Sequence, residues 1–160
     1  MAEFSLITQP HRMIAPDVLI LSPAIREAIL LHLLGAAPHE GVGLLSTSSS
    51  SDHSVVTALR FYPGANLAAS PTRFAMDPRD VLHAVREIRS AGQDLGGIVH
   101  SHVYGPPTPS EIDLAEAYYP DSLMIIVSFA RQPAEIRAWH LSKTDEQTTV
   151  TNVRITTTAA

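Results

Sequence analysis

Cysteine is absent from this chain of 160 residues, and its absence limits the chemistry that the protein can perform. Without cysteine there are no disulfide bonds, no thiolate nucleophile and no zinc site built on thiolates. Any metal ion must therefore be bound by histidine, aspartate or glutamate.

Long apolar runs are absent as well. The longest uncharged apolar stretch, residues 28–37, contains His32 and is much shorter than the roughly 20 residues that a membrane-spanning helix needs. Residues 1–16 lack the basic start, the apolar block and the small-residue cleavage site of a signal peptide. We therefore expect a cytoplasmic protein without a membrane segment.

Clusters of basic residues are the third absence. The 11 Lys and Arg residues are scattered and the formal net charge is −5, so the sequence gives no electrostatic footprint for nucleic acid. With 45% hydrophobic and 17% charged residues, the composition is that of an ordinary soluble globular protein. The length favours one domain over residues 1–160, with a core at about 17–142 and an irregular lead-in at 1–16.

The pattern of apolar residues predicts strands interleaved with helices. Ser22 and Pro23 are typical of a helix start, and that helix ends near Gly35; Asp77 and Pro78 begin a second helix, which Gly92 ends. The remaining segments predict strands at 18–20, 41–46, 55–62, 73–76, 95–102, 123–129, 135–141 and 148–155, with a solvated loop at 47–53. The expected fold class is α/β or α+β, with a central mixed, largely antiparallel sheet flanked by helices.

A further helix is expected after the proline-rich run at 105–109. Thr108 and Glu111 stand three apart like the partners of a capping box, and Pro109 suits the first helical position. Ser110 and Asp113 lie three apart on this helix and therefore share one face. Because prolines stiffen the loop, that face can be turned toward the strand at 95–102.

His100 and His102 are the most informative residues of the chain. Side chains two apart on a strand point to the same face, so this pair can bind one ion. Alone, the pair is equally explained by packed or solvated histidines. Together with Asp113 it offers the imidazole and carboxylate ligands that zinc accepts when no thiolate is available, and three protein ligands leave a fourth position for water.

Hydrolysis also needs a proton carrier and a group that stabilises the oxyanion. Ser110, at a helix start, can donate a hydrogen bond to a developing negative charge, although a serine there often serves only its own backbone. Glu40 is the candidate proton carrier because it lies between an apolar helix and an apolar strand; a surface glutamate in a turn is the alternative. His32 and His83 lie on apolar helices and are assigned to packing.

These residues carry a resemblance to a known family. Glu40, ahead of a Gly-x-Leu strand, and the run His100-x-His102-x7-Ser110-x-x-Asp113 resemble the JAMM (MPN-plus) zinc metallopeptidases, which include the proteasomal lid deubiquitinase and many small bacterial proteins. The resemblance covers residues 18–141. It implies that His100, His102 and Asp113 bind Zn²⁺, that Glu40 is general base and then general acid, and that Ser110 supports the tetrahedral intermediate. It also implies a sheet flanked by helices, related to the cytidine deaminases.

The departures from the family pattern are small. Val103 stands where the family often has proline, Ser46 replaces a glycine, and neither is a ligand. The chain lacks the long insertions with which eukaryotic members grip ubiquitin. The resemblance therefore favours a small prokaryotic form that cleaves amide bonds at the Gly-Gly end of ubiquitin-like or sulfur-carrier proteins.

Other functions and partners stay open at this point. A non-catalytic MPN-type binding or scaffold module is one alternative, and a zinc hydrolase acting on small molecules is another, which the lack of a Pro-Cys-x-x-Cys element disfavours. Asn66 and the Arg73-Phe74 pair border a substrate groove, or belong to a turn and an ordinary edge strand. Exposed edges of the sheet would allow a homodimer. Neither nucleic acid nor a membrane is an expected partner.

Overall fold

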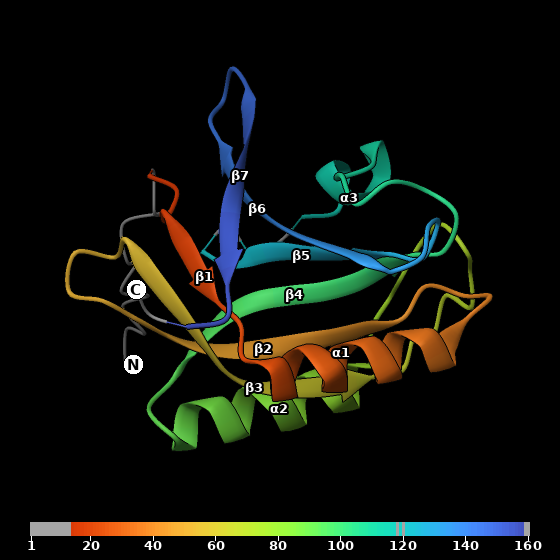
Figure 1. Cartoon of the computed structure of the whole chain (residues 1–160), viewed down its shortest axis with the longest axis horizontal. Coiled ribbons are helices and arrows are strands. Elements are labelled where there is room, and N and C mark those ends of the chain that lie inside the picture. Colours follow the sequence, from red (N-terminus) through yellow and green to blue (C-terminus); the bar gives the residue numbers. More distant parts are fainter. Residues whose placement is uncertain (1–13, 118, 120, 159–160) are drawn as a thin grey trace, which may run out of the picture.

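The computed structural model describes residues 14–117, 119 and 121–158, so most of the expected lead-in lies outside the described part. Strands and helices follow one another along the chain as Figure 1 shows. Their bounds are β1 (Val18–Ile20), α1 (Pro23–Ala36), β2 (Val42–Ser49), β3 (Val55–Gly64), α2 (Pro78–Ser90), β4 (Asp94–His102), α3 (Glu111–Ala115), β5 (Leu123–Ser128), β6 (Glu135–Lys143) and β7 (Thr148–Thr156).

The strands form one sheet that closes on itself as a barrel. The strand order is β1–β3–β2–β4–β5–β6–β7, and β1 closes the barrel by pairing with both β3 and β7. The pairs β2–β3, β2–β4, β5–β6 and β6–β7 are antiparallel, whereas β1–β3, β1–β7 and β4–β5 are parallel. The mixed α+β class with a sheet and flanking helices is confirmed. The expected relation to the cytidine deaminases stays a prediction.

Closure of the barrel differs from the open sheet that the sequence suggests. β1 has only 3 residues, and nothing in so short a segment reveals that it pairs on both sides. Within the described residues the barrel leaves no open sheet edge, which removes the argument on which the expected homodimer was based. The homodimer itself stays a prediction.

The first two helices begin where the sequence predicts. Ser22 Oγ accepts the N–H of Ile25 at 3.3 Å and caps α1, whose first residue is Pro23. The Asp77 carboxylate accepts the N–H of Arg79 at 2.9 Å and caps α2. Both caps satisfy N–H groups that have no partner within the helix, which is why these local signals are dependable.

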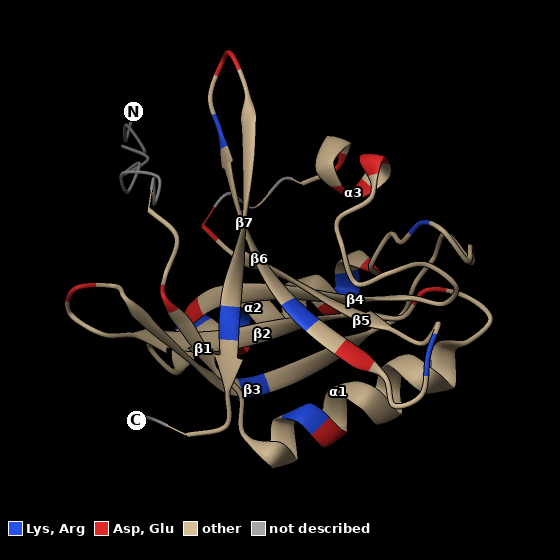
Figure 2. Cartoon of the chain, turned by 45° about the horizontal axis from the view of Figure 1, so that its top comes forward, with Lys and Arg blue, Asp and Glu red and all other residues tan. Residues whose placement is uncertain are grey.

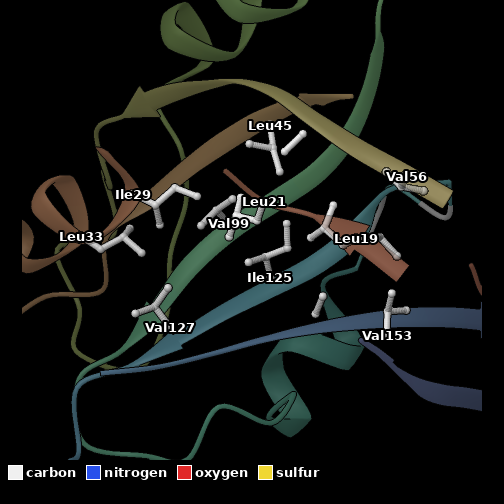
Figure 3. Packing of buried hydrophobic residues seen from close by; sticks show 13 residues of the cluster. Leu19, Leu21, Ile29, Leu33, Leu45, Val56, Val99, Ile125, Val127 and Val153 are labelled. Carbon is white, nitrogen blue, oxygen red and sulfur yellow. The ribbon is translucent and has the colours of Figure 1, made fainter. Parts of the chain in front are cut away.

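Alternating residues of β2 pack against different helices. Leu45 belongs to the main core with Ile29 and Leu33 of α1, whose side chains point into the same interior in Figure 3. Leu44, the neighbour of Leu45, packs instead with Ala84 and Ile88 of α2. The two helices therefore cover opposite faces of this part of the sheet. Burying one aliphatic side chain of this size contributes about 1.5–3 kcal/mol, so both layers contribute substantially to stability.

Two local expectations are wrong. Residues 47–49, expected in a solvated loop, continue β2, and the turn that follows is ordered by Asp52, which accepts hydrogen bonds from the hydroxyls of Ser50 and Ser54. Residues 73–76, expected as a strand, make only an isolated bridge between Asn66 and Met76. At residues 47–49, pairing with β3 stabilises the strand although the polar composition of this segment favours a loop.

Charged side chains are distributed unevenly over the elements. Figure 2 shows Lys and Arg spread along several elements, while Asp and Glu gather on α3 and at the turn between β6 and β7. Every helix in the described part of the chain is too short or too polar to cross a membrane.

Candidate active site

β4 presents the two histidines on the face that is turned away from α1. His100 pairs with Val42 and Ile98 with Leu44, so the face that holds the histidines is the one on which α2 packs. His100 is 0% exposed and His102 is 7% exposed. Their Nε2 atoms lie 3.3 Å apart, which confirms that the alternation of the strand brings the two rings together.

Asp113 reaches both histidines from α3. Its Oδ1 lies 3.2 Å from Nε2 of His100, and its Oδ2 lies 3.0 Å from Nε2 of His102. Like the histidines, Asp113 is buried. The carboxylate therefore faces two imidazole nitrogens at once, in a space that water scarcely reaches.

The start of α3 differs from the expected one. The N-cap is Ser110, and the capping box pairs Ser110 with Asp113 rather than Thr108 with Glu111. Ser110 Oγ accepts the N–H of Asp113 at 3.1 Å, and Asp113 Oδ2 accepts the N–H of Ser110 at 2.9 Å. Thr108 and Pro109 stay in the loop. Asp113 thus fixes the start of the helix with the same oxygen that faces His102.

The three side chains fit a metal ion. One ligand atom from each of His100, His102 and Asp113 lies within 4.8 Å of the others. Ligands at about 2.0–2.1 Å from a tetrahedral zinc ion stand about 3.3 Å apart, close to the separations seen here. His102 Nδ1 donates to the Pro106 carbonyl at 2.7 Å, which leaves the lone pair of the ring on Nε2, where a metal would accept it.

Burial and hydrogen bonding have opposite effects on the pKa values of His100, His102 and Asp113. Burial lowers the pKa of His100. Burial also opposes ionisation of Asp113 and His102, but the hydrogen bonds between them prevail, so the pKa of Asp113 is well below its usual range and that of His102 is raised. A carboxylate therefore persists beside the two rings, which is the charge that a divalent cation requires.

Glu40 lies beside this group although it precedes β2. Val42 pairs with His100 in an antiparallel ladder, so continuing the register by two residues places Glu40 opposite His102. The side chain is 2% exposed, and its Oε2 has no hydrogen-bond partner among the described residues. Burial, opposed by the positive charge of His102 and reinforced by Asp113, raises the pKa of Glu40 to about 7. The alternative of a surface glutamate in a turn is thereby excluded.

The backbone around Glu40 is held from several sides. The N–H of Glu40 donates to the Ser70 carbonyl at 2.8 Å, and Asn66 Nδ2 donates to the Glu40 carbonyl at 2.9 Å. The N–H of Gly41 donates to Ser101 Oγ at 2.8 Å. Glu40 is therefore a buried acid on a fixed backbone, able to take up and release a proton near neutral pH.

A cavity of about 500 Å³ opens beside Asp113. Phe74, Met76, Ile98 and Ile112 are among the apolar residues that line it, and an ion pair between Arg73 and Glu116 joins its two sides. Phe74 also covers the ring of His100, with 4.7 Å between the ring centroids. Of the two alternatives for the Arg73-Phe74 segment, the structure shows it at the border of a cavity, and binding of substrate there stays a prediction; Asn66 supports the segment by donating to the Arg73 carbonyl.

Several residues that support the site escaped the sequence analysis. Ser101 lies between the two histidines and is fully buried, yet only the pairing of β4 with the segment before β2 reveals its partner, Gly41. Ser128 and Trp139 bind the loop before α3 from distant strands, and no local signal marks them. His32, assigned to packing, contacts the carbonyls of Val42 and Gly64 through Nε2.

Comparisons with known proteins agree with this arrangement. The domain family described as prokaryotic homologs of the JAB domain matches residues 22–142. A desampylase of Haloferax volcanii is 35% identical over 115 residues, which are 69% of this chain and 80% of that protein. A Thermus thermophilus protein named "Probable TtuB-protein conjugate cleaving protease" is 36% identical over 101 residues, which are 62% of this chain and 64% of that protein. The solution structure of a Desulfitobacterium hafniense protein has a TM-score of 0.74 and 30% identity, covering 87% of this chain and 91% of that chain. The chain therefore belongs to the family of prokaryotic JAB-domain homologs, which confirms its resemblance to the JAMM proteins.

Proposed function

We propose that this protein is a zinc-dependent metallopeptidase or isopeptidase. Its proposed substrates are ubiquitin-like or sulfur-carrier proteins, hydrolysed at the amide bond that follows a carboxyl-terminal Gly-Gly. The observation that carries the proposal is the buried Glu40 carboxyl beside the convergent ligand atoms of His100, His102 and Asp113. Burying four ionisable groups together is costly, and catalysis at a bound metal explains why they share one place.

The residues divide the proposed reaction between them. A zinc ion held by His100, His102 and Asp113 would supply an activated water and polarise the scissile carbonyl. Glu40 takes a proton from the attacking water and hands it to the leaving amine; burial, which raises its pKa in the metal-free protein, favours its holding that proton between the two steps. The oxygen of Ser110 accepts the N–H of Asp113, so its own proton is available to donate to the oxygen that gains negative charge.

The cavity beside Asp113 is the proposed place for the substrate tail. It begins at Asp113 and is lined by Phe74, Met76 and Ile98, so an extended chain with apolar side chains can bury them there while its end lies beside Asp113. Two terminal glycines carry no side chains and pass a narrow approach most easily. Support also comes from the Thermus thermophilus relative, whose name describes a protease that cleaves TtuB-protein conjugates.

A scaffold role explains the site less well. A binding module needs no buried cluster of potential metal-ligand atoms and no buried acid with an oxygen that lacks a hydrogen-bond partner among the described residues, as Glu40 Oε2 does. Metal analysis separates the two functions, because a scaffold is expected to contain no stoichiometric zinc.

The test is cleavage of Gly-Gly-tailed ubiquitin-like fusions by the purified protein, with and without a chelator. We expect cleavage after the second glycine, loss of activity with chelator and recovery on addition of zinc. Glu40→Gln should retain zinc and lose turnover, whereas Glu87→Gln, a matched change at an exposed site on α2, should leave both unchanged. Cleavage that is insensitive to the chelator, or full activity in Glu40→Gln, would refute the proposed mechanism.

A further inference from the structure

Three consecutive carbonyl groups in the loop between β4 and α3 each accept a hydrogen bond from a side chain. The acceptors and donors are Gly105 with Ser128 Oγ at 2.6 Å, Pro106 with His102 Nδ1 at 2.7 Å, and Pro107 with Trp139 Nε1 at 2.8 Å. The donors come from the neighbouring strands β5, β4 and β6. The loop 105–107 is thus fastened to the sheet at three successive residues.

The two prolines of this loop, Pro106 and Pro107, restrict its backbone hydrogen bonding. Proline has no N–H, so Pro106 and Pro107 present acceptors alone. A carbonyl cannot donate, and the bond to Pro106 therefore requires the proton of the His102 ring to be on Nδ1. In the neutral ring the lone pair is then on Nε2, whereas in the protonated ring Nε2 donates to Asp113 Oδ2 at 3.0 Å. The position of the Pro106 carbonyl thus selects the tautomer of His102 that can bind a metal.

The other histidine lacks such a partner. His100 Nδ1 is buried and has no hydrogen-bond partner among the described residues. Its ring is covered by Phe74 instead, a contact that restricts its position but not its tautomer. Asp113 contacts Nε2 of both rings, so what distinguishes His102 is its additional hydrogen bond at Nδ1.

We propose that Ser128 and Trp139 are positioning residues that fix His102 through the loop 105–107. Ser128 is the register partner of His102 in the parallel pair β4–β5, and its hydroxyl is oriented by the N–H of Ala130 at 3.2 Å. Trp139, on the adjacent strand β6, donates to the carbonyl of Pro107, two residues after Gly105. With both neighbours of Pro106 fastened, its carbonyl cannot rotate away from Nδ1. The inference rests on the proposed function only in that His102 binds a metal ion.

A purely structural role is the competing explanation, because Trp139 also packs beside Met124, Ile126 and Leu141. Trp139→Phe keeps an apolar ring but removes the N–H that Pro107 accepts. Ser128→Ala removes a hydroxyl and almost no volume. Ser46→Ala is the matched control, since Ser46 is equally buried and donates to a carbonyl, that of Arg60, far from the loop.

The first readout is the tautomer of His102 in metal-free protein, measured by ¹⁵N imidazole NMR at alkaline pH, where the ring is neutral. The wild type and Ser46→Ala should show one ring wholly in the Nδ1–H form. In Trp139→Phe and Ser128→Ala that signal should shift toward a mixture of tautomers. An unchanged signal in both variants would overturn the proposal, as would the same change in Ser46→Ala.

The second readout is zinc affinity, measured by competition with a chromophoric chelator. Partners of a metal ligand typically contribute about 10- to 100-fold to affinity, so we expect the dissociation constant to rise severalfold in each variant and about tenfold or more in the double variant. Affinity equal to that of the wild type in the double variant would overturn the proposal. Neither readout uses cleavage, so a protein that binds zinc but cleaves no Gly-Gly substrate contradicts the proposed function alone.

Discussion

The buried carboxyl of Glu40 predicts how the stability of the metal-free protein depends on pH. Its pKa is raised from 4.5 to about 7 in the folded protein, chiefly by burial. As pH rises above 4.5, the unfolded chain loses this proton first, so unfolding is favoured increasingly until pH passes about 7. Ionisation of Glu40 therefore lowers the free energy of unfolding progressively as pH rises from about 4.5 to about 7.

The magnitude follows from the difference between the two pKa values. A pKa of about 7 in place of 4.5 corresponds to about 3 kcal/mol, since one pKa unit is about 1.4 kcal/mol. Glu40→Gln cannot ionise and lacks this loss. Relative to the wild type, the variant should gain up to about 3 kcal/mol in free energy of unfolding between about pH 4.5 and about pH 8.

The assay is urea denaturation of chelator-treated protein across this pH range. The pKa values of His100 and His102 are shifted as well, but both residues are present in both proteins, so the difference between wild type and Glu40→Gln isolates Glu40 apart from its coupling to them. Glu87→Gln serves as the exposed control and should give a difference that does not vary with pH. A constant difference for Glu40→Gln as well would show that the carboxyl is ionised at no cost, and the argument from burial would fail.

Three further substitutions test the packing and the hydrogen bonds around the site. Ser101→Ala leaves the buried N–H of Gly41 without its acceptor and should lower the free energy of unfolding by about 1–3 kcal/mol, measured by urea denaturation. Ile125→Ala, at a fully buried core position, should cost about 2–5 kcal/mol in the same assay while zinc content stays unchanged. Ser110→Ala removes the cap of α3 and should cost about 1 kcal/mol. In a cleavage assay the same variant should lower kcat by about 10²- to 10³-fold with little change in KM, and a normal kcat would remove Ser110 from the mechanism.

The parts of the fold that the sequence predicts correctly depend on short-range rules. The caps at Ser22 and Asp77 act within three residues, and the alternation that puts His100 and His102 on one face acts within two. Both remain valid whatever the rest of the chain does. Closure of the barrel by β1 depends instead on pairing with β3 and β7, from distant parts of the chain. No local sequence pattern predicts that β1 pairs with these two strands.

The start of α3 shows how two local patterns compete. Thr108 with Glu111 and Ser110 with Asp113 both place a hydroxyl three residues before a carboxylate, so the sequence alone allows either capping box. The carbonyls of 105–107 are bound by side chains of three strands, which holds the chain in its loop conformation until Pro109 and leaves Ser110 as the cap. Tertiary hydrogen bonds therefore decide between alternatives that propensity leaves equal.

The position of Glu40 depends on register in the same way. The antiparallel pairing of Val42 with His100 brings Glu40 level with His102, and a slip of one residue would turn its side chain to the opposite face. Ser101 stabilises the observed register, because its hydroxyl accepts the N–H of Gly41 and its own N–H donates to the Gly41 carbonyl. Ser101 faces away from the candidate metal-ligand atoms of His100 and His102. Its two hydrogen bonds to Gly41 nevertheless fix the distance between those atoms and Glu40, the proposed proton carrier.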